Sequence, residues 1–169
     1  MLELDAEATY RSFALKVREL AAGRDLRLVG VHTGGVWLAQ RLRQDLQIAE
    51  EVGSLDVSFY RDDFERSGLS ATVRPSRIPF EVAGRHLLLV DDVLYTGRTT
   101  RAAMNELFDH GRPARIDLAV LIDRGGRELP IAATVVGRTL EVPPNISVVL
   151  SRDDDLRLHL TLEQRRDDV

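Results

Sequence analysis

Apolar residues recur at intervals of three and four in three parts of the chain, which is the spacing of an amphipathic helix. The clearest case follows Asp5, a good N-cap residue, and places Tyr10, Phe13 and Val17 on one face. The three helices are predicted over residues 6–22, 36–46 and 99–110.

Short apolar runs between the helices have the length and character of buried strands. These strands are predicted at Leu26–Val31, His86–Asp91, Ile116–Asp123, Ile131–Val136 and Ile146–Leu150. Apolar and polar residues alternate from Leu55 to Phe59, which predicts a half-buried strand, and from Leu156 to Leu162, which predicts an edge strand. Residues 64–79 contain two prolines and no stable period, and they predict a long mobile loop.

Strands alternate with helices through residues 26–123, which favours an α/β fold with a mainly parallel central sheet flanked by helices. A length of 169 residues predicts one domain. We expect its core at about residues 25–123. The chain ends, about 1–24 and 124–169, are expected to form a small cap, or hood, over one end of the sheet.

Composition excludes several classes of function. The chain has no cysteine, which excludes disulfides, thiolate metal sites and a cysteine nucleophile. A formal net charge of −4 excludes a general nucleic-acid binder that is basic throughout, but it does not exclude a local basic patch. No apolar run approaches the roughly 20 residues of a membrane span, and residues 1–5 lack the pattern of a signal peptide. We therefore expect a soluble cytoplasmic protein.

Polar residues of the kinds that bind ligands or take part in catalysis follow three of the predicted strands, in the segments 32–35, 60–63 and 91–100. Ligands of open parallel sheets bind outside the carboxyl ends of the strands. If these strands are neighbours, the three segments face one crevice.

The segment 91–100 carries the strongest signal. Asp91 and Asp92 end a buried strand, and the small, hydroxyl-rich residues 96–100 begin a helix. Such a turn offers backbone N–H groups, hydroxyls and the positive end of a helix dipole to a phosphate. The two carboxylates lie too close to the turn to bind the same phosphate, and they suit the hydroxyls of a ribose. The structural alternative is that the acidic pair caps a helix and Gly97 only makes a turn.

Two other phosphate motifs are excluded by spacing. A Walker A loop requires glycine and lysine where Asp92 and Arg98 stand, and no G-x-G-x-x-G follows a strand.

The run Val90-Asp91-Asp92-Val93-Leu94-Tyr95-Thr96-Gly97-Arg98-Thr99 resembles the phosphoribosyl-pyrophosphate (PRPP) motif of type I phosphoribosyltransferases. Tyr60-Arg61-Asp62-Asp63 and the segment Leu121–Ile131 narrow the resemblance to the PyrR family of pyrimidine operon regulators. The resemblance covers roughly residues 25–150. It implies the type I phosphoribosyltransferase fold and a uracil phosphoribosyltransferase that converts uracil and PRPP to UMP and pyrophosphate. It also implies sensing of UMP or UTP, binding of pyr operon mRNA, and a homodimer or higher homo-oligomer.

The resemblance assigns roles to individual residues. Asp91, Asp92 and Arg61 are the expected catalytic residues, with the acidic pair on the PRPP hydroxyls and Arg61 facing the pyrophosphate. The PRPP or nucleotide site is expected at Thr33, Gly34, Asp91, Asp92, Val93, Leu94, Tyr95, Thr96, Gly97, Arg98, Thr99 and Thr100. The uracil pocket is expected at Asp123, Arg124 and Val148. Mg²⁺ is implied through the pyrophosphate of PRPP, with no protein ligand assigned, and the loop 64–79 is expected to exclude water.

The sequence departs from the family at His32-Thr33-Gly34-Gly35, where many members carry a basic residue and Thr-Arg-Gly. Each missing charge-assisted contact contributes roughly 1.5–3 kcal/mol, so we expect weak catalysis. Tyr95 stands where purine enzymes typically have an aspartate, which favours a pyrimidine base. The alternative function is a catalytically weak, nucleotide-binding regulator that acts through a protein partner rather than RNA. Of the other candidates, we expect Trp37 in the core and residues 153–155 in a solvated acidic turn.

Overall fold

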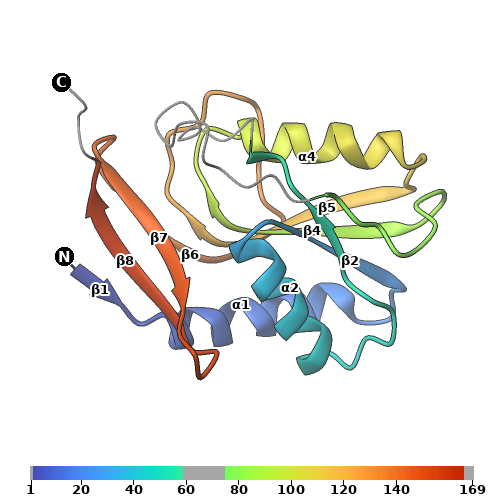
Figure 1. Ribbon diagram of the computed structural model, residues 1–169, viewed down its shortest axis with the longest axis horizontal. Helices are drawn as coiled ribbons and strands as arrows, with labels where there is room; N and C mark the ends of the chain where they lie inside the picture. The colour runs from blue at the N-terminus through green and yellow to red at the C-terminus, as the bar shows by residue number, and fades with distance from the viewer. Residues whose placement is uncertain (1, 59–74, 166–169) are drawn as a thin grey trace.

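The computed structural model describes residues 2–58 and 75–165. Within these ranges the strands form two sheets, and Figure 1 shows helices on both faces of the larger one. The larger sheet has the order β3-β2-β4-β5-β6, and all its neighbouring strands are parallel. Its strands are β2 (Leu26–Val31), β3 (Gly53–Leu55), β4 (His86–Leu94), β5 (Arg115–Asp123) and β6 (Val135–Thr139). The predicted α/β class with a parallel central sheet is confirmed.

The smaller sheet is antiparallel and has the order β1-β8-β7. Its strands are β1 (Leu2–Leu4), β7 (Ile146–Arg152) and β8 (Leu158–Gln164). It brings the two ends of the chain together, because Leu4 of β1 is paired with Leu160 of β8. This sheet stands at one end of the molecule, beside the central sheet (Figure 1).

Three helices cover the central sheet in the described part of the chain: α1 (Ala6–Ala21), α2 (Gly34–Asp45) and α4 (Arg98–Asp109). All three agree with the predicted ranges to within two residues. Helix α1 begins as predicted at Asp5, whose carboxylate accepts a hydrogen bond from the Ala8 N–H at 2.8 Å. Figure 1 shows α1 and α2 on one face of the sheet and α4 on the other.

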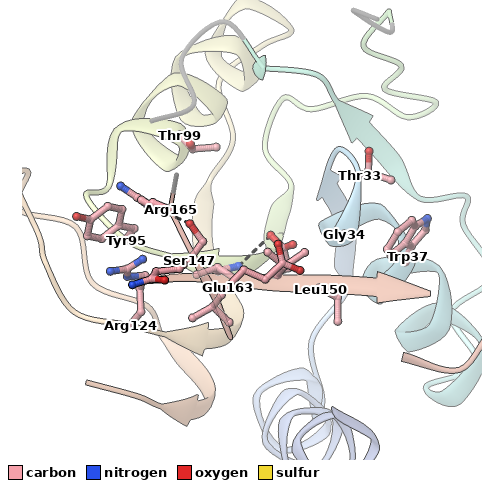
Figure 2. A pocket seen from close by; sticks show the side chains of 15 residues that line it. Thr33, Gly34, Trp37, Tyr95, Thr99, Arg124, Ser147, Leu150, Glu163 and Arg165 are labelled. Carbon is pink, nitrogen blue, oxygen red and sulfur yellow. Dashed lines mark hydrogen bonds between the residues drawn. The ribbon is translucent and has the colours of Figure 1, made fainter. Parts of the chain in front are cut away.

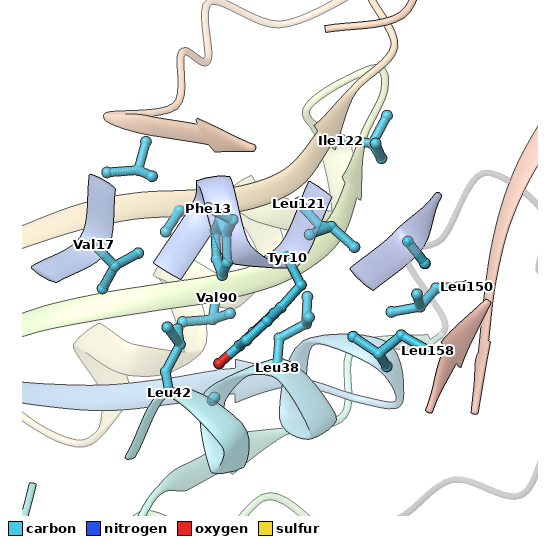
Figure 3. Close-up of a cluster of buried hydrophobic side chains, with 14 of the residues drawn as sticks. Tyr10, Phe13, Val17, Leu38, Leu42, Val90, Leu121, Ile122, Leu150 and Leu158 are labelled. Carbon is cyan, nitrogen blue, oxygen red and sulfur yellow. The ribbon is translucent and has the colours of Figure 1, made fainter. Parts of the chain in front are cut away.

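A hydrophobic cluster lies on each face of the central sheet. On the α1 and α2 face, Tyr10 and Phe13 of α1 are buried with Leu38 and Leu42 of α2 (Figure 3). The same cluster includes Leu150 and Leu158 of the smaller sheet, so it joins the two sheets. The other cluster packs α4 against the opposite face, with Leu107 and Val120 among its fully buried members.

The cap is smaller than the sequence predicted. Only β1, β7 and β8 form the smaller sheet, whereas α1 and β6 belong to the core. The reason lies in α1, whose apolar face of Tyr10, Phe13 and Val17 needs the central sheet to cover it. Residues 6–21 therefore cannot serve in a separate cap.

Six predicted strands differ in their boundaries: β5 begins one residue earlier, at Arg115, β7 continues two residues further, to Arg152, and the other four differ as follows. Strand β4 continues to Leu94, three residues beyond its predicted end, and β6 covers 135–139 rather than 131–136. The ladder of β3 covers 53–55, earlier than the predicted strand; Phe59 lies outside the described residues. Strand β8 begins at 158 because Leu156 is an exposed turn residue with φ of 64°.

Residues 60–63 and most of the predicted mobile loop lie outside the described residues. Its final part is described, and there Ser54 and Arg77 exchange two backbone hydrogen bonds of 2.8 Å. This end of the segment therefore pairs with β3. No helix in the described part of the chain is long and apolar enough to cross a membrane.

Candidate nucleotide-binding site

A cavity of about 450 Å³ lies between the carboxyl ends of the central strands and the smaller sheet. Eight of the residues predicted for the site line it: Thr33, Gly34, Asp92, Val93, Tyr95, Thr99, Arg124 and Val148. Figure 2 shows Tyr95, Arg124 and Arg165 together at one end, and Thr33, Gly34 and Trp37 at the other. The ends of β2 and β4 thus meet as the crevice argument predicts.

The loop after β2 forms the first wall of the cavity. The His32 N–H donates to the Leu55 carbonyl at 2.8 Å, and the His32–Thr33 peptide bond is cis. A Cβ added at Gly34 would lie only 2.5 Å from Asp92 Oδ2. A side chain at position 34 would therefore force the Asp92 carboxylate or the loop to move.

The acidic pair lies on β4, which runs past both residues. Each carboxylate accepts the next backbone N–H at 2.9 Å, from Asp92 to Asp91 Oδ1 and from Val93 to Asp92 Oδ1. Successive side chains of a strand point to opposite sides. In keeping with this, Asp92 lines the cavity, whereas Asp91 is 7% exposed and is not part of the lining.

The predicted phosphate turn connects β4 to α4. Thr96 Oγ1 accepts a hydrogen bond from the Arg98 N–H at 3.2 Å, and Gly97 has φ of 93°, a conformation that favours glycine. Helix α4 begins at Arg98, so the positive end of its dipole and its first-turn N–H groups other than that of Arg98 lie at this end, where they suit an anion. Thr99 lines the cavity, and Thr100 is buried.

Two residues of the predicted motif have other surroundings. Leu94 is buried in the apolar cluster beneath α4. The exposed Arg98 side chain pairs with Glu128 at 2.9 Å. Both residues would therefore contribute backbone atoms rather than side chains to a bound nucleotide.

The aromatic end of the cavity is built on Tyr95 and two arginines. The buried Arg124 guanidinium lies 3.9 Å from the centre of the Tyr95 ring and donates to the carbonyls of Ile146 and Pro143. A second guanidinium, from Arg165, lies 5.0 Å from the same centre. Cation–π attraction holds guanidinium groups over an aromatic ring, so this wall is both flat and positively charged.

Asp123, predicted for the uracil pocket, does not line the cavity. Its carboxylate accepts the Gly125 N–H at 3.0 Å and pairs with the Arg127 guanidinium at 2.5 Å. The carboxylate is held by its own loop and faces protein groups. Arg61, the third predicted catalytic residue, lies outside the described residues.

Sequence reasoning missed a large part of the cavity wall: Trp37, Ser147, Val149, Leu150, Glu163, Gln164 and Arg165. Trp37, predicted as core, packs on the apolar cluster but also lines the cavity, with the Arg152 guanidinium 4.8 Å from its ring centre. The others lie on β7 and at the end of β8. Four consecutive residues of β7, 147–150, line the cavity, so the alternation of a strand could not have indicated them.

The described residues contain no group of three His, Cys, Asp or Glu side chains that could hold a metal ion. Mg²⁺ ordinarily keeps several waters and binds through one or two carboxylates together with substrate phosphates. The cavity, with one carboxylate from the acidic pair in its wall, fits an ion held mainly by a phosphorylated substrate.

Comparison with known proteins identifies the fold and the family. The profile of the phosphoribosyl transferase domain matches residues 4–153. The chain belongs to the phosphoribosyltransferase family. It is 47% identical over 164 residues to the bifunctional protein PyrR of Nitrosococcus oceani, covering 94% of this chain and 93% of that protein. It is 54% identical over 136 residues to the bifunctional protein PyrR of Pseudomonas syringae pv. tomato, covering 80% of each chain.

The predicted resemblance to PyrR proteins is therefore confirmed. The predicted type I phosphoribosyltransferase fold is confirmed as well. A hypoxanthine-guanine phosphoribosyltransferase from Bacillus anthracis superimposes with a TM-score of 0.67 at 17% identity, over 83% of this chain and 85% of that one. An identity this low is evidence for the fold alone.

Proposed function

We propose that this protein transfers the phosphoribosyl group of PRPP to uracil and that the same cavity senses uridine nucleotides. The observation that carries the proposal is the set of groups around one cavity. One cavity brings together a helix-start turn, a carboxylate and a flat cationic wall, which suit the phosphate, the ribose and the base of a nucleotide. The name of the relatives, bifunctional protein PyrR, supports a double role.

In the proposed complex the turn at 96–100 binds the 5′-phosphate, and Asp92 accepts hydrogen bonds from the ribose hydroxyls. The base lies toward Tyr95, Arg124 and Val148. Holding the ribose and uracil together converts an encounter of two reactants into a reaction within one complex. The bond from C1′ to the uracil N1 forms, the bond from C1′ to pyrophosphate breaks, and the N1 proton passes to solvent.

Charge separates as this reaction proceeds. The sugar becomes positive, and the carboxylate of Asp92 stabilises it; pyrophosphate becomes negative at the Thr33 and Gly34 end. Mg²⁺, when it is bound with PRPP, neutralises charge on the leaving pyrophosphate. Arg61 is proposed to act on the same group. Because the loop 32–35 lacks the basic residue and Thr-Arg-Gly that the family resemblance implies, we expect slow turnover.

The test is UMP formation from labelled uracil and PRPP. Asp92→Asn is expected to lower kcat/KM about 10- to 100-fold, because a charge-assisted contact contributes roughly 1.5–3 kcal/mol. The control is Asp154→Asn, which changes an exposed acid of the turn between β7 and β8. Absence of UMP while PRPP binding persists would remove the transferase proposal.

The loop 32–35 also favours a second candidate, in which regulation is the main role and catalysis is weak. In its first form the protein binds pyr operon mRNA when UMP or UTP is bound, as a homodimer or higher homo-oligomer. A gel-shift titration with and without UMP tests this form. In its second form the nucleotide-bound protein acts through a protein partner, and a pull-down that loses the partner with Asp92→Asn supports it.

A further inference from the structure

The segment 124–131 crosses the phosphate turn and is bonded to its backbone. The N–H groups of Glu128 and Leu129 both donate to the Thr96 carbonyl at 3.0 Å. The exposed ion pair between Arg98 and Glu128 adds a contact at the rim. The turn is thus supported by a loop that follows β5.

Arg127 is the centre of this support. Its guanidinium donates to the Tyr95 carbonyl at 2.7 Å, to Asp123 Oδ2 at 2.5 Å and to the Ile131 carbonyl at 2.9 Å. The side chains of Arg127 and Asp123 are only 25% and 19% exposed, so these bonds are partly shielded from water. Asp123 is in turn fixed by the Gly125 N–H.

These bonds orient the turn because a peptide unit is planar and trans. A carbonyl held in place fixes the direction of the N–H on the other side of its plane. Arg127 holds the Tyr95 carbonyl and so fixes the Thr96 N–H. The Glu128 and Leu129 N–H groups hold the Thr96 carbonyl and so fix the Gly97 N–H. Two successive peptides of the turn are set by this one loop.

We propose that Arg127 is a positioning residue for the 5′-phosphate and that Asp123 acts by holding Arg127 rather than by contacting uracil. The proposal rests on the proposed function, since it concerns the same nucleotide. It predicts that both residues matter for the phosphate of a nucleotide and not for its base. A residue that only stabilised the fold would affect all ligands alike.

The test compares UMP with uridine, the latter measured in competition, for the wild type and Arg127→Ala. We expect the Kd for UMP to rise about tenfold, the effect of losing a charge-assisted bond, and the Kd for uridine to stay within about twofold. Arg101→Ala, an exposed arginine of α4, is the matched control and should leave both constants unchanged. Arg127→Lys keeps the charge without the planar fork, and an intermediate effect is expected.

Asp123→Asn distinguishes the two roles of that residue. If Asp123 acts through Arg127, Asp123→Asn weakens the binding of UMP and leaves that of uridine unchanged. The double variant Asp123→Asn/Arg127→Ala then binds UMP no more weakly than Arg127→Ala alone. Amide hydrogen exchange provides a readout without any ligand: exchange should rise at Glu128 and Leu129 in Arg127→Ala while the core strands stay protected.

Two results would overturn the positioning role. One is that Arg127→Ala weakens the binding of UMP and of uridine equally, and the other is that it leaves both UMP binding and amide hydrogen exchange unchanged. If Asp123→Asn weakens the binding of uridine and Arg127→Ala does not, the result shows that Asp123 contacts the base directly. If the wild type binds neither UMP nor PRPP, the proposed function itself fails, which is a different result from any of these.

Discussion

Replacing Gly34 by alanine tests the contact between the two walls of the cavity. The new Cβ would lie 2.5 Å from Asp92 Oδ2 and 2.8 Å from its Cγ, whereas ordinary contacts are about 3.5 Å or longer. Overpacking of this kind costs about 1–3 kcal/mol. If the carboxylate instead turns away, it loses the Val93 N–H bond of 2.9 Å, at a cost of about 1 kcal/mol.

Either response moves the carboxylate that is proposed to bind the ribose. We therefore expect Gly34→Ala to lose about 1–3 kcal/mol in urea unfolding and to bind UMP about 10- to 100-fold more weakly by calorimetry. Gly23→Ala is the control: its φ is 69° and no atom lies near its Cβ, so it carries backbone strain without a contact. Gly34→Ala protein that binds UMP within about twofold of the wild type would refute the reasoning.

Three further predictions concern the fold and the base. The Arg115 guanidinium holds the pKa of the Asp117 carboxyl below its ordinary value. The ion pair therefore stabilises the fold fully above about pH 3.9, and this stabilisation is lost progressively as the pH falls below that value. Asp117→Asn should lower the urea midpoint at pH 7, and its difference from the wild type should shrink on acidification below that pH. Glu7→Ala removes the acceptor of the Leu158 N–H and should cost about 1 kcal/mol in the same assay, with faster amide exchange in β8. Tyr95→Ala should raise the KM for uracil several-fold and leave that for PRPP unchanged, because only the ring is lost; equal changes in both would contradict a base-side role.

Local patterns were sufficient to predict the core of the fold. Asp5 and the apolar face that follows it predict α1, because the N-cap and the helical spacing of apolar residues are both set by residues close together in the sequence. The run His86–Asp91 has four consecutive apolar residues and the length of a buried strand, which is how it is predicted. The turn at Gly97 was predictable for the same reason, since its positive φ and the helix start that follows are local.

The differences arise where contacts that form only in the folded chain decide the structure. Strand β1 has only three residues and is defined by its pairing with β8, near the other end of the chain. Ile131 was assigned to a strand, yet it packs at the Gly97 turn and its carbonyl is held by Arg127. The resemblance implies that Asp123 belongs to the base pocket, and only the folded loop reveals that its carboxylate pairs with Arg127.

The wall formed by β7 and the end of β8 illustrates the same limit. Ser147 and Arg165 are joined by a hydrogen bond of 3.0 Å although 18 residues separate them. Neither residue carries a motif, and the contact of Arg165 with the Tyr95 ring depends on how the two sheets pack.

The most direct measurement of the central claim is a crystal structure of this protein with UMP. The account predicts the phosphate against the backbone of residues 96–100, the ribose hydroxyls at Asp92 and the uracil ring toward Tyr95 and Arg124. A nucleotide bound elsewhere, or no nucleotide in this cavity at saturating UMP, would contradict it.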